Sequence, residues 1–477
     1  MYQIRFGTEG WRAVLAEGYT FDRVRAVARA AGRWFKHTGA TAPVAVGHDT
    51  RFLGARFAAA VADELAECGV DTRLCSGPLP TPAIGYYVVS SSLAGAVVLT
   101  ASHNSAEWNG VKVRRAEGCS IFEEEAEWIE TEANAILRSP PGEWAPERQH
   151  QRFDVRNGYV DRLLDMVDRE AIARAKLTVV ADLMHGAGAG YFDEALRRVG
   201  CAEVRAVRGD PDPTFEGRHP EPIGPNLEAS TALTADAAVD IGLATDGDAD
   251  RLGMMAHGEY VDVMRAIVLV LYQLLKNRQW RGRVVRAVDV TSMVDRLCAH
   301  FGVPVVETSI GFKNLAREMI KSDDIILAVE ESGGFGIRGH IPDRDGSLAA
   351  LVACEALAHE RKPLREVLAD IFALAGGERF YDRLDIRLSP EERARLAERL
   401  PDLSPDRLAG QAVVEVNRLD GAKYLRRDGA WMMLRLSGTE PLVRVYAEGV
   451  SETDLRALLQ AGQRLLGHRV GRDVHWC

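Results

Sequence analysis

The sequence predicts an α/β fold with mostly parallel sheets, followed by a smaller α+β unit that begins near Arg379. Through the first three quarters of the chain, short apolar runs of strand length alternate with segments that carry apolar residues at helical spacing. Beyond Arg379, short strands are interspersed with two helices, expected at residues 390–400 and 452–466. By length alone, the 477 residues suggest about three domains.

Buried strands are expected at five apolar runs, residues 44–47, 95–99, 177–181, 241–244 and 325–329. Each run leads into a polar loop, and helices are expected after two of the loops, at residues 53–68 and 191–199. In parallel sheets, ligands bind at the carboxyl ends of the strands. These polar loops are therefore the first places to look for a functional site.

Composition and charge exclude several classes of protein. Hydrophobic residues make up 47% of the chain and charged residues 27%, as in an ordinary folded protein. The net charge of −10 argues against a nucleic-acid partner, because such a partner requires a basic surface. A small anionic substrate is compatible with this charge, since a few local Arg and Lys residues can reverse the field inside a cleft.

The cysteines and apolar segments bear on cellular location. The seven cysteines are scattered and show no CxxC spacing, which indicates neither a zinc site nor a disulfide framework and fits a reducing compartment. The N-terminal residues lack the basic and apolar regions of a signal peptide. The longest apolar stretch, residues 266–275, is too short to span a bilayer and is expected to be a core helix. We therefore expect a cytoplasmic protein with no membrane partner.

An acidic loop follows the fourth predicted strand. Its carboxylates, Asp246, Asp248 and Asp250, alternate along an extended segment and can turn toward one point. Bringing them together is costly unless a cation neutralises them, and oxygen ligands favour Mg²⁺, Ca²⁺ or Mn²⁺ over zinc. An EF-hand is excluded, because Arg251 and His257 stand where that loop needs Gly and Glu. The alternative is a solvated acidic turn.

A candidate nucleophile, Ser102, lies in the loop after the second predicted strand. The surrounding residues do not form a G-x-S-x-G elbow, so a hydrolase of that type is not indicated. The turn at residues 109–112 could bring Lys112 over Ser102, and His103 is adjacent. Cations around a serine suit phosphoryl transfer, because they offset charge on the equatorial oxygens. The alternative is an ordinary loop serine.

Two further loops have the chemistry to bind a sugar phosphate. Residues 435–444 form a hydroxyl-rich glycine turn with Arg435 and Arg444 at its ends, which could clamp a phosphate or be a plain hairpin turn. Glu330 and Ser332 end another strand and suit sugar hydroxyls, although a helix-capping pair is equally compatible. The chain has no G-x-x-x-x-G-K-[ST] motif, which disfavours an ATP-dependent kinase.

Taken together and in this order, these motifs resemble the α-D-phosphohexomutase family, and among its members they look most like phosphoglucomutases. The resemblance covers nearly the whole chain, through residues 6–12, 47–51, 100–104, 109–112, 246–251, 311–313, 330–334 and 435–444. One departure is Ser105, which stands where the family usually has Pro. Loss of Pro is expected to loosen the loop without removing a reacting group.

The resemblance implies three related α/β domains with mixed, mostly parallel sheets and a smaller C-terminal α+β domain. The expected boundaries are residues 1–146 with the phosphoserine loop, 147–252 with the metal loop, 253–376 with the sugar-binding loop and 377–477 with the phosphate-binding loop.

The resemblance also implies a role for each motif. Ser102 would carry the phosphoryl group, and one of its phosphate oxygens would join Asp246, Asp248 and Asp250 around Mg²⁺. The groups around the transferring phosphoryl would be Arg12, His103, Lys112 and Arg251. The substrate would be bound by Gly311, Phe312, Lys313, Glu330 and Ser332, and its non-reacting phosphate by Arg435, Ser437, Gly438, Thr439 and Arg444.

The implied reaction interconverts hexose 1-phosphate and hexose 6-phosphate through a phosphoserine and a hexose 1,6-bisphosphate, which also serves as activator. The forms of the loops at 311–313 and 330–334 favour glucose; a phosphomannomutase or a phosphoglucosamine mutase is the alternative. A non-catalytic sugar-phosphate-binding protein and a Mg²⁺-dependent phosphatase are the further alternatives. The expected partner is a hexose phosphate, and the expected state is a monomer or homodimer.

Overall fold

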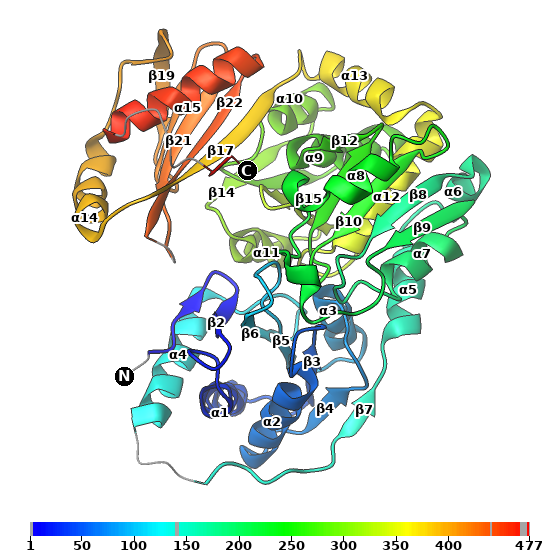
Figure 1. Cartoon of the computed structure of the whole chain (residues 1–477), viewed down its shortest axis with the longest axis vertical. Helices are drawn as coiled ribbons and strands as arrows, with labels where there is room; N and C mark the ends of the chain where they lie inside the picture. Colours follow the sequence, from blue (N-terminus) through cyan, green and yellow to red (C-terminus); the bar gives the residue numbers. More distant parts are fainter. Residues whose placement is uncertain (1–2, 139–142, 439–440, 468–474, 477) are drawn as a thin grey trace.

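The computed structural model describes residues 3–138, 143–438, 441–467 and 475–476, which form three α/β domains and a smaller C-terminal domain. Figure 1 shows the first domain in blue at the bottom, the second and third in green and yellow at the upper right, and the C-terminal domain in orange and red at the upper left. The predicted fold class is confirmed.

The first domain is built on a seven-stranded sheet in the order β1-β2-β6-β5-β3-β4-β7. The strands are β1 (Phe6–Gly7), β2 (Gly10–Val14), β3 (Val44–His48), β4 (Thr72–Cys75), β5 (Gly95–Leu99), β6 (Trp108–Arg114) and β7 (Gln151–Phe153). The helices are α1 (Phe21–His37), α2 (Gly54–Glu67), α3 (Thr81–Ser90) and α4 (Glu123–Arg138). Strands β3, β4, β5 and β7 are parallel, and β7 joins this sheet although it follows the boundary expected at residue 146.

Both faces of this first sheet are covered, as the continuous apolar runs at β3 and β5 predict. Alternate residues of β3 enter different cores: Val44 and Val46 pack with α1 and α2, whereas Ala45 belongs to the large core shared with the next two domains. The first domain is therefore docked on its neighbours through an apolar layer.

The second domain has the strand order β12-β11-β10-β8-β9. Its strands are β8 (Thr178–Asp182), β9 (Glu203–Val207), β10 (Ile241–Thr245), β11 (Leu252–Ala256) and β12 (Glu259–Val261). Its helices are α5 (Arg156–Asp165), α6 (Arg169–Ala175), α7 (Phe192–Arg198) and α8 (Glu228–Leu233). Strands β8, β9 and β10 are parallel, so the loop after β10 opens at the carboxyl edge of the sheet.

The third domain has the strand order β14-β13-β15-β16. Its strands are β13 (Arg283–Ala287), β14 (Val305–Thr308), β15 (Ile325–Glu330) and β16 (Gly334–Ile337). Its helices are α9 (Val263–Tyr272), α10 (Met293–His300), α11 (Phe312–Lys321), α12 (Gly346–Glu360) and α13 (Leu364–Leu374). Helix α12 is buried on every side because it packs between the sheets of the second and third domains.

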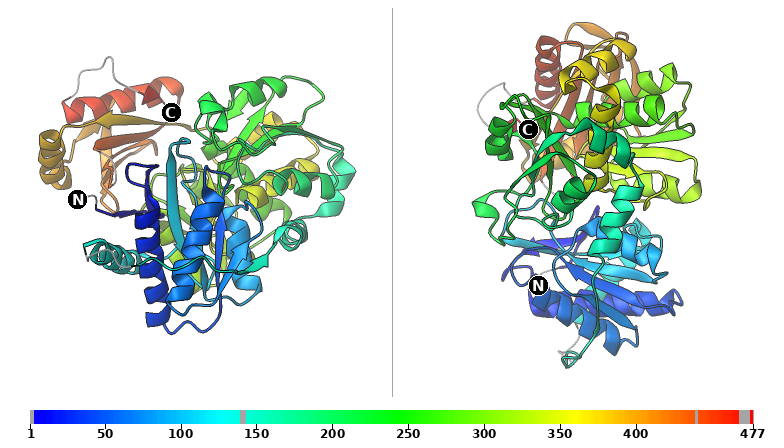
Figure 2. Two further views of the ribbon diagram at one scale, coloured as in Figure 1. Left: turned by 60° about the horizontal axis from the view of Figure 1, so that its bottom comes forward. Right: turned by 90° about the vertical axis from the view of Figure 1, so that its right-hand side faces the viewer.

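The C-terminal domain is an antiparallel sheet with its own apolar core. The strand order is β18-β19-β20-β21-β22-β17-β23. The strands are β17 (Phe380–Arg387), β18 (Arg407–Leu408), β19 (Gln411–Asn417), β20 (Ala422–Arg426), β21 (Trp431–Leu436), β22 (Leu442–Gly449) and β23 (His475–Trp476). The helices are α14 (Pro390–Arg399) and α15 (Glu452–Leu466). Figure 2 shows this domain standing beside the other three.

The predicted strands and helices agree with the structure to within a few residues. The strand expected at 95–99 and the helix expected at 452–466 have those bounds, and the expected core helix at 266–275 is α9 continued by a π-helical turn, Gln273–Asn277. Within the described ranges, no helix is long and apolar enough to cross a membrane.

Candidate active site

Loops from the first and second domains meet at Ser102 and the acidic loop. The Ser102 hydroxyl donates a hydrogen bond of 2.8 Å to Asp246 Oδ2, and both residues are fully buried. Gly247 permits this approach, because a Cβ at that position would lie only 2.5 Å from the Ser102 carbonyl oxygen. The structure therefore places the predicted nucleophile against the predicted metal loop.

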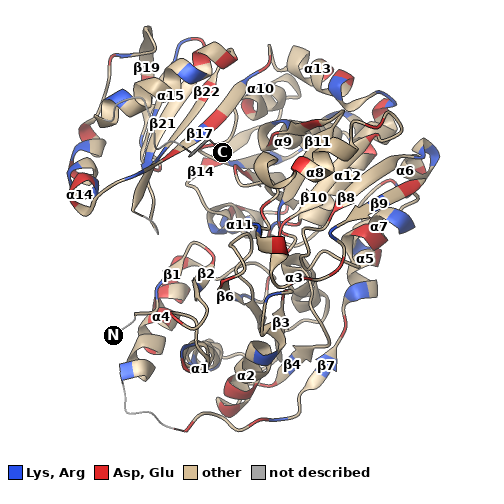
Figure 3. Cartoon of the chain, in the orientation of Figure 1, with Lys and Arg blue, Asp and Glu red and all other residues tan. Residues whose placement is uncertain are grey.

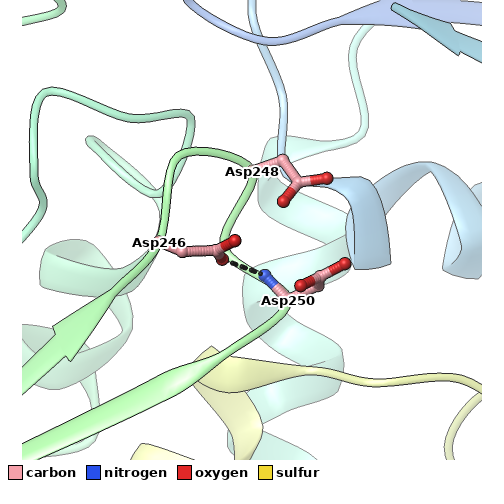
Figure 4. A group of neighbouring side chains, drawn as sticks. All are labelled: Asp246, Asp248 and Asp250. Atoms are coloured by element: carbon pink, nitrogen blue, oxygen red, sulfur yellow. Dashed lines mark hydrogen bonds between the residues drawn. The ribbon is translucent and has the colours of Figure 1, made fainter. Parts of the chain in front are cut away.

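The three aspartates of the acidic loop converge, as Figure 4 shows. One oxygen from each of Asp246, Asp248 and Asp250 lies within 4.8 Å of the others, and all three residues are buried. Among the described residues, Asp248 Oδ1 and Asp250 Oδ1 have no hydrogen-bond partner. Buried, unpaired carboxylate oxygens are costly, and a hard divalent cation would satisfy them. These residues fit such a cation.

Like charges at the acidic loop affect its protonation. Burial, reinforced by the carboxylates of Asp250 and Asp248, raises the pKa of Asp246 well above its usual range. For Asp250, burial acts in the same direction, but Arg344, Lys112 and Arg251 outweigh it and hold the pKa below its usual value. The loop is thus unevenly charged when no cation is bound.

Two buried cations neutralise much of this acidic loop. Lys112 Nζ donates to Asp248 at 2.7 Å and to Asp250 at 3.1 Å. Burial would lower the pKa of Lys112, but the two aspartates and Glu9 raise it, so the side chain is an ammonium. Arg344, from the loop after β16, donates to Asp250 at 2.6 Å and also pairs with Glu330 and Glu9. Figure 3 shows acidic and basic segments interspersed among the loops drawn between α11 and α3.

Ser102 has an unusual backbone and an uncharged neighbour. Its φ of 52° lies in the left-handed region, which a serine adopts only when its surroundings impose it. The Ser102 hydroxyl lies 3.4 Å from His103 Nδ1. Burial, together with the charges of Arg251 and Arg12, holds the pKa of His103 well below its usual value. The imidazole is therefore neutral at neutral pH.

The loop that carries Ser102 is braced by Arg51. The Arg51 guanidinium donates to the carbonyls of Ser102 at 2.7 Å, Ser105 at 2.7 Å and Trp108 at 2.9 Å, and also to that of Asn104. Asp49 in turn accepts from Arg51 Nε at 3.1 Å. These bonds hold the loop in place although Ser105 replaces the Pro that is usual in the family.

Arg12 and Arg251 also contact the loops around Ser102. Arg12 Nη1 donates to the Asn104 side chain at 2.8 Å. Arg251 Nη1 donates to Glu221 at 3.2 Å, and the backbone N–H of Arg251 donates to Asp246. The four residues predicted to surround the phosphoryl group thus come from the first and second domains.

The sugar-binding loop predicted in the third domain joins the same cluster. Ser332 Oγ donates to Glu330 Oε1 at 2.6 Å, and Glu330 also accepts from Arg344. A β-bridge between Arg251 and Gly334 connects this loop directly to the acidic loop. Burial raises the pKa of Glu330, against the opposing charge of Arg344.

The predicted substrate turn at residues 311–313 lies at the start of α11. Gly311 precedes α11 with a φ of 109°, which favours glycine. The Phe312 side chain is only 2% exposed and packs below the Arg344 guanidinium, which is 5.6 Å from its ring centroid. The Phe312 ring therefore lies in the core against Arg344, and its role in substrate binding stays a prediction. Lys313 Nζ lies 3.2 Å from Glu123 of α4.

The phosphate-binding turn lies in the C-terminal domain. Arg435 on β21 and Arg444 on β22 are direct cross-strand partners, which would repel unless anions were near. Ser437 is buried, and its N–H donates to Leu442 O at 3.0 Å to close the turn, while Gly438 is exposed. Thr439 lies outside the described residues.

Several site residues were not predicted from the sequence. Glu9 pairs with Lys112 at 3.6 Å and with Arg344. Burial would raise the pKa of Glu9, but these two charges outweigh it and lower the pKa to about 2. Glu9 lies inside the motif at residues 6–12, and Arg344 lies in an acidic–basic run after a strand, so both could have been found. Thr81, which donates to Asp248 at 2.6 Å, has no such signal because Thr-Pro at a helix start is ordinary capping chemistry.

Comparisons with known proteins agree with this arrangement. Models of the phosphoglucomutase/phosphomannomutase family match α/β/α domain I at residues 3–139, domain II at 157–259, domain III at 264–374 and the C-terminal domain at 391–461. A phosphoglucomutase/phosphomannomutase of Thermococcus kodakarensis is 29% identical, with 97% of this chain and 98% of that protein covered.

A phosphoglucosamine mutase of Frankia alni is 31% identical, with 94% of each chain covered. The crystal structure of a candidate phosphomannomutase from Thermus thermophilus superimposes with a TM-score of 0.86 at 36% identity, covering 98% of this chain and 99% of that one. The fold and the site are those of a sugar-phosphate mutase. The chain belongs to the phosphoglucomutase/phosphomannomutase family.

Proposed function

We propose that this protein interconverts hexose 1-phosphate and hexose 6-phosphate, with Ser102 as the residue that carries the phosphoryl group between them. The observation that carries the proposal is the 2.8 Å contact between Ser102 Oγ and Asp246 of the buried acidic loop, with Lys112 against the other two carboxylates of that loop. A serine oxygen fixed beside a cation site and an ammonium suits phosphoryl transfer.

In the first half-reaction, a hydroxyl oxygen of the bound sugar phosphate attacks the phosphorus on Ser102. The new P–O bond forms as the bond to Ser102 Oγ breaks, and the product is a hexose 1,6-bisphosphate. In this step one proton leaves the attacking hydroxyl and one is gained by Ser102 Oγ, and the neutral His103, 3.4 Å from Ser102 Oγ, would be a hydrogen-bond partner of the leaving serine oxygen. The second half-reaction reverses these steps with the other phosphate of the bisphosphate.

The remaining residues would stabilise charge and hold the sugar. Mg²⁺ bound by Asp246, Asp248, Asp250 and the phosphoserine would neutralise the carboxylates and polarise the phosphoryl oxygens. Lys112, Arg12 and Arg251 would offset charge on the phosphoryl group. Glu330 and Ser332 would bind sugar hydroxyls, and Arg435, Ser437, Gly438, Thr439 and Arg444 the non-reacting phosphate.

The test is turnover of Ser102→Ala against a matched control, Ser105→Ala, in the same loop. We expect Ser102→Ala to abolish interconversion of glucose 1-phosphate and glucose 6-phosphate, and Ser105→Ala to keep it. Full activity of Ser102→Ala would contradict the proposal. Release of inorganic phosphate by the wild type, in place of the isomerised sugar phosphate, would favour a phosphatase.

For the hexose, we propose glucose, because the forms of the loops at 311–313 and 330–334 resemble those of phosphoglucomutases. Glucosamine is the second candidate, favoured by the Frankia alni relative. A mispaired sugar hydroxyl costs about 1–3 kcal/mol, so glucose should lead mannose by at most about two orders of magnitude. The test compares catalytic efficiency on glucose, mannose, glucosamine and N-acetylglucosamine 1-phosphates. A tenfold lead for any other sugar would contradict the glucose assignment alone.

A further inference from the structure

Two chains of polar contacts join the sugar-binding side of the third domain to the phosphate-binding arginines of the C-terminal domain. We propose that Arg383, Asp385 and Asp420 are positioning residues that orient Arg444 and Arg435, so that sugar and phosphate recognition are coupled. The inference rests on the proposed function and extends it to residues with no assigned role.

The first of these two chains of contacts, which we call the first bridge, begins at Glu331, the middle residue of the predicted sugar-binding loop. Both of its carboxylate oxygens accept from Arg383 Nη1, at 2.9 Å and 3.2 Å. Arg383 Nε lies 3.0 Å from Asp385 Oδ1, and Asp385 Oδ2 lies 3.5 Å from Arg444 Nε. One alternating series of charges therefore runs from the sugar-binding loop to Arg444.

The second bridge passes through Asp420. Arg435 Nε donates to Asp420 Oδ1 at 2.8 Å, and Asp420 Oδ2 accepts from the backbone N–H of Ile310 at 3.0 Å. Ile310 directly precedes Gly311 and helix α11. Arg435 is thus connected to a loop of the third domain through Asp420, and Arg444 through Asp385 and Arg383.

The strand register explains why these carboxylates are needed. Asp385, Arg444 and Arg435 occupy one cross-strand row over β17, β22 and β21, so their side chains share one face of the sheet. Arg435 Nε donates a hydrogen bond to Asp420, and Arg444 Nε forms an ion pair with Asp385 at 3.5 Å. The two carboxylates thus place negative charge beside the adjacent guanidinium groups and offset their mutual repulsion.

These contacts are better suited to orienting the two arginines than to stabilising the fold. The side chains of both bridges are 15–24% exposed, and ion pairs that contact solvent contribute little to folding. An arginine has many rotamers, and holding one rotamer before the phosphate arrives lowers the entropic cost of binding. Loss of a bridge should therefore raise KM and leave kcat nearly unchanged, because the non-reacting phosphate is held alike in ground and transition states.

The experiment uses Arg383→Gln and the control Arg387→Gln, an exposed residue of the same strand. We expect Arg383→Gln to raise KM for glucose 1-phosphate about five- to tenfold with kcat within about twofold, and Arg387→Gln to leave both unchanged. Arg383→Lys, which keeps the charge, should recover part of the loss. An unchanged KM in Arg383→Gln would overturn the proposal.

A double variant tests whether Arg383 acts through Arg444. If it does, Arg383→Gln combined with Arg444→Ala should bind no more weakly than Arg444→Ala alone. Fold changes that multiply would show independent action and overturn the bridge. If Arg383→Gln does not fold, Glu331→Gln breaks the same bridge from the other domain and carries the same expectation.

Calorimetric titration with glucose 6-phosphate separates the two hypotheses. Wild-type binding without turnover would contradict the proposed mutase activity, while a weakened Kd in Arg383→Gln would still support the bridge. Turnover by the wild type with an equal Kd in both proteins would overturn the bridge and leave the mutase proposal standing.

Discussion

Charged side chains cluster both around Ser102 and at the predicted phosphate-binding turn, but they are neutralised differently in the two regions. Around Ser102, carboxylates and cations from three domains are buried together, so their charges must be matched inside the protein. In the C-terminal domain, the arginines and their carboxylates are partly exposed, and water screens them. In the proposed function, the first region is the reaction centre and the second is the surface that binds the non-reacting phosphate.

This difference predicts different consequences of mutation. Removing one buried charge near Ser102 leaves its partner unpaired and should affect chemistry and folding together. Removing one charge at the phosphate-binding turn should weaken substrate binding alone. The following variants test that contrast.

The largest effect is expected for Asp248→Asn. The change removes a candidate cation ligand, so activity should fall steeply. It also leaves buried Lys112 with one partner fewer, and a broken buried pair costs about 3–5 kcal/mol of stability. Asp236→Asn, at an exposed residue of the same domain, is the control.

Removal of the metal tests the same assignment. EDTA should abolish wild-type activity and Mg²⁺ should restore it, whereas Ca²⁺ should bind yet support little turnover. Undiminished activity after exhaustive EDTA treatment would refute the metal assignment.

A smaller effect on binding is expected for Arg444→Ala. Loss of one charged hydrogen-bonding contact to the non-reacting phosphate costs about 1.5–3 kcal/mol, or about ten- to a hundredfold in affinity. Phosphorylation of Ser102 should still occur, because the reaction centre is intact. Steady-state kinetics and the phosphate content of Ser102 measure the two effects separately, and an unchanged KM would remove Arg444 from the site.

The last effect is on stability and not on activity, near the junction of the third and C-terminal domains. Burial, with Glu331 and Glu330 nearby, raises the pKa of Asp289 to about 8. The folded protein then keeps a proton that the unfolded chain loses near pH 4, so the free energy of unfolding falls between about pH 4 and 8, by at most about 1.4 kcal/mol per unit. Asp289→Asn should flatten this slope in pH-dependent chemical denaturation. An equal slope in both proteins would show that Asp289 ionises normally.

The reaction centre could be predicted from sequence because its chemistry is local. Three aspartates follow an apolar strand of the second domain and a serine follows one of the first domain, so each group lies at the carboxyl edge of its own parallel strands. The α/β class follows from the alternation of apolar runs and helices, whereas the four-domain architecture is implied by the resemblance to the family. The individual residue roles and the domain boundaries remain predictions.

What the sequence could not predict depends on pairings between distant segments. Arg344 reaches Asp250 across 94 positions, and Asp420 reaches Ile310 across 110. The buried position of Phe312 likewise depends on how α11 packs, because a Gly-Phe-Lys turn is equally compatible with an exposed loop. Register, packing and inter-domain contacts decide these cases, and none of them leaves a local pattern in the sequence.

The central claim, that Ser102 carries the phosphoryl group, is tested most directly by peptide mass spectrometry. The wild type incubated with glucose 1,6-bisphosphate should gain one phosphate, about 80 Da, on the peptide that contains Ser102, and should lose it on addition of glucose 1-phosphate. Ser105→Ala should behave in the same way, and Ser102→Ala should gain no phosphate. Active enzyme with no phosphate on Ser102, or phosphate on Ser105 instead, would contradict the account.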